Sequence, residues 1–346
     1  MQIKRRTVLL GLASLSLPLI ATSCNQSSQK TASNTAASPA SNSGQLARIR
    51  VGYQVYAGSE LLAKGLGLAK QFFPNTKVEY LRFDAGRDVN VAMAAKGIDI
   101  GLVGSTAAAV GISSGISYQI FYLDDLIGKL EALVVKNNIR SFADLRGKKI
   151  AVPFSSTDHY SLLSLLKLEN INQNELKILD MVATDMLAAW QRGDIDGGYV
   201  WEPTQSKMRQ DGGTILATSE DLAKRGYATF DVAVVRTEFA QQYPDVLKQY
   251  RLMLDKSVKI YRDDPQTAAK ALAAELGVSP KEALAQAGQI IWLDSSNQSD
   301  PKYLGTANQS GAISKGLKDT ADFMVEQKAI PTAPSQEAYQ QRILYL

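Results

Sequence analysis

The sequence RGDIDG at residues 192–197 echoes KGIDIG at residues 96–101, and this pair of segments decides the fold. In each, a helical stretch ends at a Gly, which is favoured at the left-handed position that follows a helix. An Asp and a second Gly then lead into a short apolar run that is typical of a buried strand. Asp99 and Asp196 therefore occupy matching places, and the echo predicts two similarly built lobes.

Short apolar runs alternate with amphipathic stretches on both sides of these segments. The predicted strands are 49–53, 77–83, 98–103, 118–123, 133–135, 149–152, 177–180, 198–201 and 229–235. The predicted helices are 59–73, 87–95, 106–112, 158–168, 184–191, 203–210 and 313–326, with a further helix starting at Ser279-Pro280. This α/β alternation predicts parallel strands with helices on both faces of each sheet.

The N-terminus is typical of an export signal. Lys4, Arg5 and Arg6 precede an apolar run at 8–20, and small residues then lead to Cys24. The segment resembles the lipobox of bacterial lipoproteins, which implies cleavage after residue 23 and a lipid on Cys24. Arg5-Arg6 also resembles a twin-arginine signal. An ordinary cleaved signal with an incidental Cys is the alternative. The lipid anchor would place the protein on the periplasmic or cell-surface face of a bacterial membrane.

The remaining composition excludes several function classes. The net charge of +4 falls to +1 when Lys4, Arg5 and Arg6 leave, so nothing indicates a nucleic-acid partner. Residues 24–47 are rich in Ser, Ala, Asn and Thr, which predicts a flexible tether. One Cys permits no intrachain disulfide, and one His makes a zinc site or a Ser-His-Asp triad implausible. We expect no metal, no cofactor and no catalysis.

Three loops follow predicted strands at the edge where ligands bind in open α/β sheets. Gly104-Ser105-Thr106 and the turn at 153–159 both enter helices with small hydroxylated residues, and Gln54 offers an amide after the first strand. A helix start can hold an anion with its unpaired N–H groups. Simple N-capping is the alternative for each loop. Two such loops, one per lobe, favour a shared anion site.

Acidic and aromatic residues are expected near the crossings between the lobes. Glu131 begins the strand that enters the second lobe, and Asp231 lies in the strand that returns to the first. Both can hold a positive group, although a surface or ion-paired carboxylate is the alternative. Trp201 and Tyr53 are expected either to form walls of the pocket or to belong to the core.

Four runs, EALVVK (131–136), DLRGKKIAVPF (144–154), STDHYSLL (156–163) and AAWQRGDIDGGYVW (188–201), resemble the periplasmic taurine-binding proteins of ABC importers. The resemblance is dense from residue 48 to 235. It implies a type II periplasmic-binding-protein fold, with two lobes of mixed sheet flanked by helices and the ligand in the cleft at the hinge. It divides the chain into lobe 1 (48–128 and 229–346) and lobe 2 (129–228).

The resemblance also implies roles for single residues. Glu131 and Asp231 are expected to hold the ammonium group of the ligand, and the expected sulfonate contacts are Ser105, Thr106, Ser156, Thr157, Asp158 and His159. Packing within its helix is the alternative for His159. The chain departs from the family at Thr106, at Arg87, where a small residue is expected, and at Glu202, where a neutral one is expected.

The resemblance implies a monomeric binding lipoprotein that captures taurine or a similar aminosulfonate and delivers it to a membrane permease. A binder of another sulfonate, nitrate or bicarbonate is one alternative, but a plain anion has no use for two acids in its pocket. An enzyme like the thiamine-pyrimidine synthases is another. That resemblance implies a site rich in His and Cys, which this chain lacks.

Overall fold

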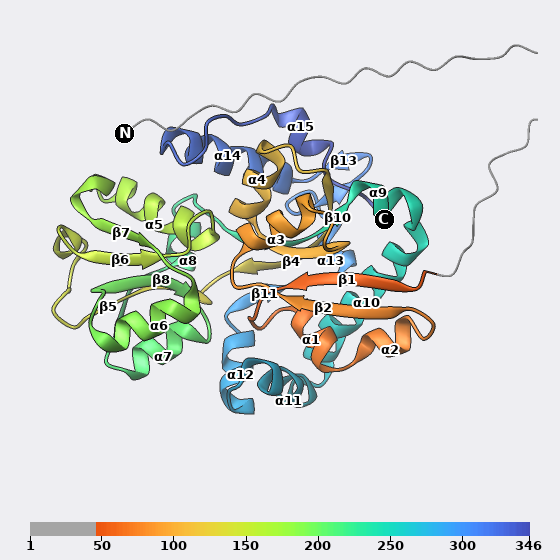
Figure 1. The fold of residues 1–346 in the computed structure, drawn as a ribbon, viewed down its shortest axis with the longest axis horizontal. Coiled ribbons are helices and arrows are strands. Elements are labelled where there is room, and N and C mark those ends of the chain that lie inside the picture. Colours follow the sequence, from red (N-terminus) through yellow and green to blue (C-terminus); the bar gives the residue numbers. More distant parts are fainter. Residues whose placement is uncertain (1–45) are drawn as a thin grey trace, which may run out of the picture. The chain divides into compact units, whose positions relative to one another are not determined.

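Two separate sheets organise residues 46–346, the part of the chain that the computed structural model describes (Figure 1). The described residues belong to one compact unit. The predicted signal, Cys24 and nearly all of the predicted tether lie outside the described residues.

The first sheet has six strands in the order β11-β4-β10-β3-β1-β2. β1 pairs in parallel with β2 and β3, whereas β10 runs antiparallel to both β3 and β4, and β11 is antiparallel to β4. The bounds are β1 Arg48–Tyr53, β2 Lys77–Arg82, β3 Ile100–Gly104, β4 Tyr118–Ile127, β10 Phe230–Arg236 and β11 Ile290–Trp292.

The second sheet has five strands in the order β7-β6-β8-β5-β9. β6 is parallel to β7 and β8, whereas β5 is antiparallel to β8 and β9. The bounds are β5 Glu131–Val135, β6 Lys149–Val152, β7 Lys177–Asp180, β8 Gly197–Trp201 and β9 Thr214–Thr218. Both sheets are therefore mixed rather than purely parallel, because β5 and β10 each run against their neighbours.

The two sheets share one topology, in which β5 and β10 take equivalent places. Each is the reversed strand next to the third strand of its βαβ unit, and each is the strand on which the chain enters that sheet after leaving the other. Because β5 runs against β8, Glu131 at its start lies opposite Trp201 at the end of β8. In the same way, Asp231 lies opposite Gly104 at the end of β3.

The echo in the sequence corresponds to one structural device used twice. The Asp99 carboxylate accepts a hydrogen bond from Arg50 N at 2.9 Å, at the start of the first sheet. The Asp196 carboxylate accepts one from Lys149 N at 2.8 Å, at the start of the second. Each Asp thus joins the loop before the third strand to the beginning of the first, which explains why the motif recurs.

Helices cover both sheets. They are α1 Ser59–Gly65, α2 Leu68–Phe72, α3 Gly86–Ala94, α4 Ser105–Ser113, α5 Thr157–Leu168, α6 Ala183–Arg192, α7 Thr204–Gln210, α8 Ser219–Ala223, α9 Thr237–Gln242, α10 Pro244–Asp263, α11 Pro265–Leu276, α12 Pro280–Ala287, α13 Ser295–Gln298, α14 Ala312–Glu326 and α15 Gln336–Gln340. Short 3₁₀ turns span Phe142–Leu145 and Gln173–Glu175, and a small hairpin joins β12 Gly305–Thr306 to β13 Gln309–Ser310.

The single helix predicted for 59–73 is two helices. Gly67 has a φ of 66°, a left-handed conformation that ends α1 and turns the chain into α2. The predicted start at Ser279-Pro280 is confirmed, because the Ser279 side chain accepts a hydrogen bond from Glu282 N. No helix among residues 46–346 is long and apolar enough to cross a membrane.

Candidate functional site

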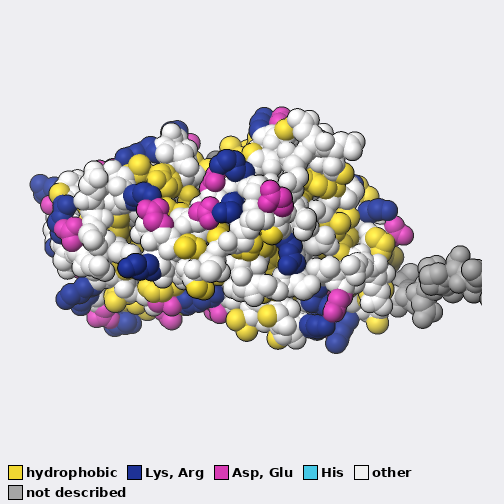
Figure 2. Space-filling model, turned by 90° about the horizontal axis from the view of Figure 1, so that it is seen from above, with side chains coloured by type: hydrophobic (Ala, Val, Ile, Leu, Met, Phe, Trp, Pro, Cys, Tyr) yellow, Lys and Arg dark blue, Asp and Glu magenta, His cyan; other side chains and the backbone are white. Residues whose placement is uncertain are grey.

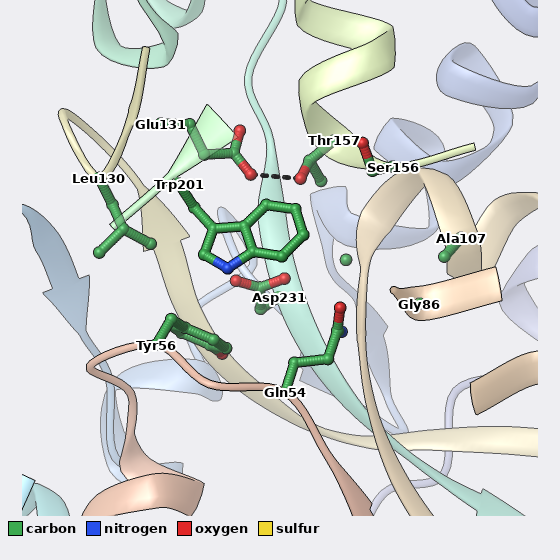
Figure 3. A pocket seen from close by; sticks show the side chains of 11 residues that line it. Gln54, Tyr56, Gly86, Ala107, Leu130, Glu131, Ser156, Thr157, Trp201 and Asp231 are labelled. Atoms are coloured by element: carbon green, nitrogen blue, oxygen red, sulfur yellow. Dashed lines mark hydrogen bonds between the residues drawn. The ribbon is translucent and has the colours of Figure 1, made fainter. Parts of the chain in front are cut away.

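A small cavity lies between the two sheets, at the carboxyl ends of β1, β3, β6 and β8 (Figure 3). It encloses about 30 Å³, which is room for only one or two water molecules. Eleven residues line it: Gln54, Tyr56, Gly86, Gly104, Ala107, Leu130, Glu131, Ser156, Thr157, Trp201 and Asp231. None of them is Lys, Arg or His.

The shared topology explains why two carboxylates meet here. Glu131 and Asp231 stand at the starts of the reversed strands β5 and β10, so both lie at the sheet edge where the parallel strands end. In the view of Figure 3, the Trp201 indole lies between the carboxylates of Glu131 and Asp231. Both side chains are almost completely buried.

Glu131 is held by two hydroxyl groups. Its Oε1 accepts a hydrogen bond from Thr157 Oγ1, and its Oε2 accepts one from Ser219 Oγ at 3.0 Å. Burial raises the pKa of Glu131 to about 7, although both hydrogen bonds oppose the shift. Burial and the nearby Glu131 and Asp124 likewise raise the pKa of Asp231 well above its usual range.

More carboxylates lie behind these two. Asp124 accepts hydrogen bonds from Tyr56 Oη at 2.8 Å and from the backbone and hydroxyl of Ser59. Asp125 lies opposite Asp231 in the β4–β10 pairing, and Asp158 follows Thr157. Neither Asp125 nor Asp158 has a hydrogen-bond partner, and both are fully buried. Burial raises the pKa of each well above normal, with further contributions from neighbouring acids.

These acids do not form a metal site. Among residues 46–346, no group of three or more His, Cys, Asp or Glu side chains is arranged to hold a metal ion. The acids nevertheless surround a cavity whose walls carry no cation, so the site attracts positive charge.

Two helices, α4 and α5, begin at the cavity. α4 starts after Gly104, and no side chain caps its first N–H groups. α5 starts after Ser156, whose Oγ accepts a hydrogen bond from His159 N at 3.2 Å and donates one to Pro153 O at 2.6 Å. Ser156 is therefore an N-cap, and it also lines the cavity. Both helix starts direct N–H groups and a positive dipole end toward the space.

Gly104 is required by the close approach of the two sheets. A Cβ at this position would lie 2.8 Å from Thr157 Cγ2 and 3.3 Å from Asp231 Oδ1. The absence of a side chain leaves the start of α4 accessible from the cavity.

Seven of the predicted ligand-binding residues line the cavity: Gln54, Gly104, Glu131, Ser156, Thr157, Trp201 and Asp231. Ser105, Thr106, Asp158 and His159 do not. Successive side chains turn by about 100° along a helix, so Ala107 and Thr157 line the cavity whereas these four residues do not. Ser105 and Thr106 are fully buried, with hydroxyls that have no hydrogen-bond partner.

His159 packs within its own helix turn. Its ring stacks on Phe154, with centroids 4.6 Å apart, and its Nδ1 accepts a hydrogen bond from Ser155 N at 3.3 Å. Burial lowers the pKa of His159 to about 4, so the ring is neutral near pH 7. This packing corresponds to the alternative that was considered for His159.

Three other residues singled out in the sequence are not part of the cavity lining. The Glu202 carboxylate accepts hydrogen bonds from Ser206 N at 2.9 Å and Ser206 Oγ at 2.7 Å, in the first turns of α7. Arg87 forms an ion pair with Asp180. Tyr53 packs edge-on against Tyr80, with ring centroids 6.1 Å apart. Glu202 therefore adds no charge to the cavity wall.

Sequence reasoning missed Tyr56, Gly86, Ala107 and Leu130 in the lining, and Asp124 and Asp125 behind it. Asp124 and Asp125 carried a usable signal, because two adjacent acids interrupt an apolar strand. Tyr56 and Leu130 lie in loops with no distinguishing pattern.

The face seen in Figure 2 gives no sign of a polyanion partner. On the face of the described residues seen in Figure 2, Lys and Arg side chains are interspersed with Asp and Glu, and no large basic patch forms.

Known proteins resemble this chain in sequence and in fold. The taurine-binding periplasmic protein of Escherichia coli (strain K12) is 35% identical over 293 residues, which cover 83% of this chain and 89% of that protein. A putative aliphatic sulfonates-binding protein of Bacillus subtilis (strain 168) is 26% identical over 295 residues, 83% of each chain.

Among solved structures, the alkanesulfonate-binding protein SsuA from Xanthomonas axonopodis pv. citri, bound to MOPS, superposes with a TM-score of 0.72. It is 23% identical and the match covers 87% of this chain and 99% of that one, so it supports the two-lobed fold. The family model described as NMT1/THI5 like matches residues 77–268. The chain therefore belongs to the NMT1/THI5 like family, with the fold of periplasmic binding proteins.

Proposed function

We propose that this protein captures taurine, or a similar small aminosulfonate, and delivers it unchanged to the permease of an ABC importer. The observation that carries the proposal is the polarity of the cavity. Glu131 and Asp231 supply two carboxylates, Gly104 and Ser156 mark two helix starts, and no cationic side chain lines the space.

The acidic side suits an ammonium group. A buried carboxylate without a counter-charge is costly, and here its pKa rises until it holds a proton. An ammonium bound between Glu131 and Asp231 would restore their ionised forms and form charge-assisted hydrogen bonds with both. The ligand would then supply the positive charge that the protein lacks at this place.

The helix starts suit a sulfonate group. Its three oxygens need several donors, and the first turns of α4 and α5 provide backbone N–H groups together with the Ser156 hydroxyl. This arrangement neutralises an anion without a cationic side chain, which would compete for Glu131 and Asp231. A dipolar ligand satisfies both sides at once.

The relatives support the same ligand class. One relative is a taurine-binding periplasmic protein, and another is a putative aliphatic sulfonates-binding protein. A plain alkanesulfonate would leave both acids without a partner, so the carboxylates favour the amine-bearing ligand. Catalysis is not part of the proposal, since both of these relatives are named as binding proteins.

We further propose that binding closes the two lobes around the ligand. The lobes would be residues 48–128 with 229–346, and residues 129–228, moving about the crossings near Glu131 and Asp231. The lining residues come from both lobes, so a ligand in the cavity would contact both of them. Cleavage before Cys24 and a lipid on that residue would hold the monomeric protein at the outer face of the membrane.

Isothermal titration calorimetry tests the proposal with three ligands. Taurine, ethanesulfonate and β-alanine differ by the amine or by the acid group. We expect taurine to bind at least tenfold more tightly than ethanesulfonate, about 1.4 kcal/mol in binding free energy. Equal affinities would eliminate the ammonium pocket, and release of any altered product would eliminate a pure binding role.

A further inference from the structure

An ion pair connects the two sheets beside the cavity. Arg87, the second residue of α3, places Nη1 within 2.6 Å of both carboxylate oxygens of Asp180, the last residue of β7. α3 follows the first sheet's β2, whereas β7 is an edge strand of the second sheet. The two side chains are about one-third exposed, so the pair lies at the rim rather than inside.

Each partner is close to a segment that lines the cavity. Arg87 directly follows Gly86, which is part of the lining. Asp180 Oδ1 also accepts a hydrogen bond from Phe154 N at 3.0 Å, in the turn that leads to Ser156 and Thr157. One carboxylate therefore contacts both the opposite sheet and the turn that carries two lining residues.

The turn at 153–157 depends on such support. Ser155 has a φ of 63°, a left-handed conformation that is unfavourable for a residue with a side chain. Four hydrogen bonds hold it: Phe154 N to Asp180, Ser155 N to His159 Nδ1, and both Ser156 N and Ser156 Oγ to Pro153 O. Asp180 supplies the bond that reaches outside the turn and its own helix.

We propose that Arg87 and Asp180 form a latch across the rim of the cavity, which slows ligand release and positions the turn at 153–157. The inference rests on the proposed function, and it concerns residues that do not contact the ligand. Opening the two sheets separates Arg87 from Asp180, so the pair stabilises the closed arrangement. Asp180 keeps its bond to Phe154 N in either arrangement.

A second ion pair serves as a matched control. Arg146 Nε lies 2.7 Å from Glu175 Oε2, with exposures of 44% and 40%. Glu175 also accepts a backbone hydrogen bond, from Asn172 N at 2.8 Å. This pair resembles the proposed latch in geometry and exposure, but both partners belong to the second sheet's half of the described chain.

Stopped-flow fluorescence measures the dissociation rate of taurine, with Trp201 in the cavity wall as reporter. We expect Arg87→Ala to accelerate dissociation by about two- to fivefold, as for an exposed ion pair, and to change association little. Arg87→Lys should retain part of the effect, and Arg146→Ala should have none. Raising the salt concentration should accelerate dissociation from the wild type but not from the Arg87→Ala protein. Unchanged dissociation in the Arg87→Ala protein overturns the latch.

A ligand-free measurement separates failure of the latch from failure of the proposed function. Spin labels at Asp185→Cys and Lys270→Cys, in the full chain carrying Cys24→Ser, report the distance between α6 and α11. If taurine does not bind the wild type, the proposed ligand is wrong and this distance decides the latch. A longer or broader distance in the Arg87→Ala protein supports it, and a distribution identical to that of the wild type and the Arg146→Ala protein overturns it.

Discussion

The cavity lining has two chemically different parts, an acidic side and a helix-start side, and they suit groups of opposite charge. The acidic side uses the side chains of Glu131 and Asp231, which stand at equivalent places on β5 and β10. The helix-start side uses backbone N–H groups at Gly104 and Ser156, with one hydroxyl and no formal charge. Thr157 lines the cavity between them and donates its hydroxyl hydrogen bond to Glu131.

Substitutions should therefore act differently on the acidic side and on the helix-start side. A side-chain substitution removes a carboxylate from the acidic side, whereas the backbone donors of α4 and α5 survive almost any substitution. The acidic side should therefore account for large effects and for selectivity, and the helix-start side for small effects.

The largest effect is expected at Asp231. Asp231→Asn removes one of the two charges that face the ammonium, so taurine affinity should fall by more than about tenfold, or 1.4 kcal/mol. The affinity for ethanesulfonate should change much less, which calorimetry of both ligands measures. Glu60→Gln is the control, since Glu60 is a buried acid that accepts a hydrogen bond from Tyr250 and lies outside the lining. A parallel loss for both ligands would remove Asp231 from ammonium binding.

The next effect is on the pH dependence of binding. Glu131, with a pKa of about 7, must lose its proton to hold an ammonium. Taurine affinity should therefore fall by about tenfold between pH 8 and pH 6, measured by titration at each pH. Ethanesulfonate provides the comparison, and an identical pH profile for the two ligands would argue against this role of Glu131.

The stability of the ligand-free protein should change in the opposite direction. The pKa of Glu131 is raised from 4.5 to about 7 on folding, so its contribution is fully present below about pH 4.5 and is lost as pH rises through 7. The melting temperature should thus be lower at pH 8 than at pH 6, and saturating taurine should reduce the difference. Glu131→Gln should flatten the profile, and a profile unchanged by that substitution would contradict the assignment.

The smallest effect is expected at Ser156. Ser156→Ala removes the cap of α5 and one hydroxyl but leaves the N–H groups, so unfolding free energy should fall by about 1 kcal/mol. Taurine affinity should fall by only about threefold, a loss that thermal melts and calorimetry would separate. A loss as large as that of Asp231→Asn would show that side chains dominate both sides.

Much of the fold could be predicted because local patterns encode it. The repeated Asp in 96–101 and 192–197 forms the same hydrogen bond in both sheets, and the strands follow the apolar runs closely. Strand direction could not be predicted from the apolar runs, since a buried run looks the same whichever way it pairs, but the mixed sheets that the family resemblance implied are confirmed. The break at Gly67 was missed because the apolar pattern continues through it.

Residues of the candidate site could be predicted where their position along the chain determines their place in the fold. Glu131 and Asp231 follow the crossings between the sheets, so their place at the hinge follows from topology. Ser105, Thr106, Asp158 and His159 were expected in the cavity because they are near helix starts, but the rotation along a helix turns them away. Asp125 depends on pairing between β4 and β10, which are far apart in the chain. Direct contact of the predicted residues with a ligand stays a prediction.

A crystal structure with taurine bound would test directly whether the carboxylates hold the ammonium group and the helix starts hold the sulfonate. We expect the ammonium nitrogen at about 2.7–2.9 Å from carboxylate oxygens of both Glu131 and Asp231, with the sulfonate at the first turns of α4 and α5. A sulfonate that faces the carboxylates, or taurine bound outside this cavity, would contradict it.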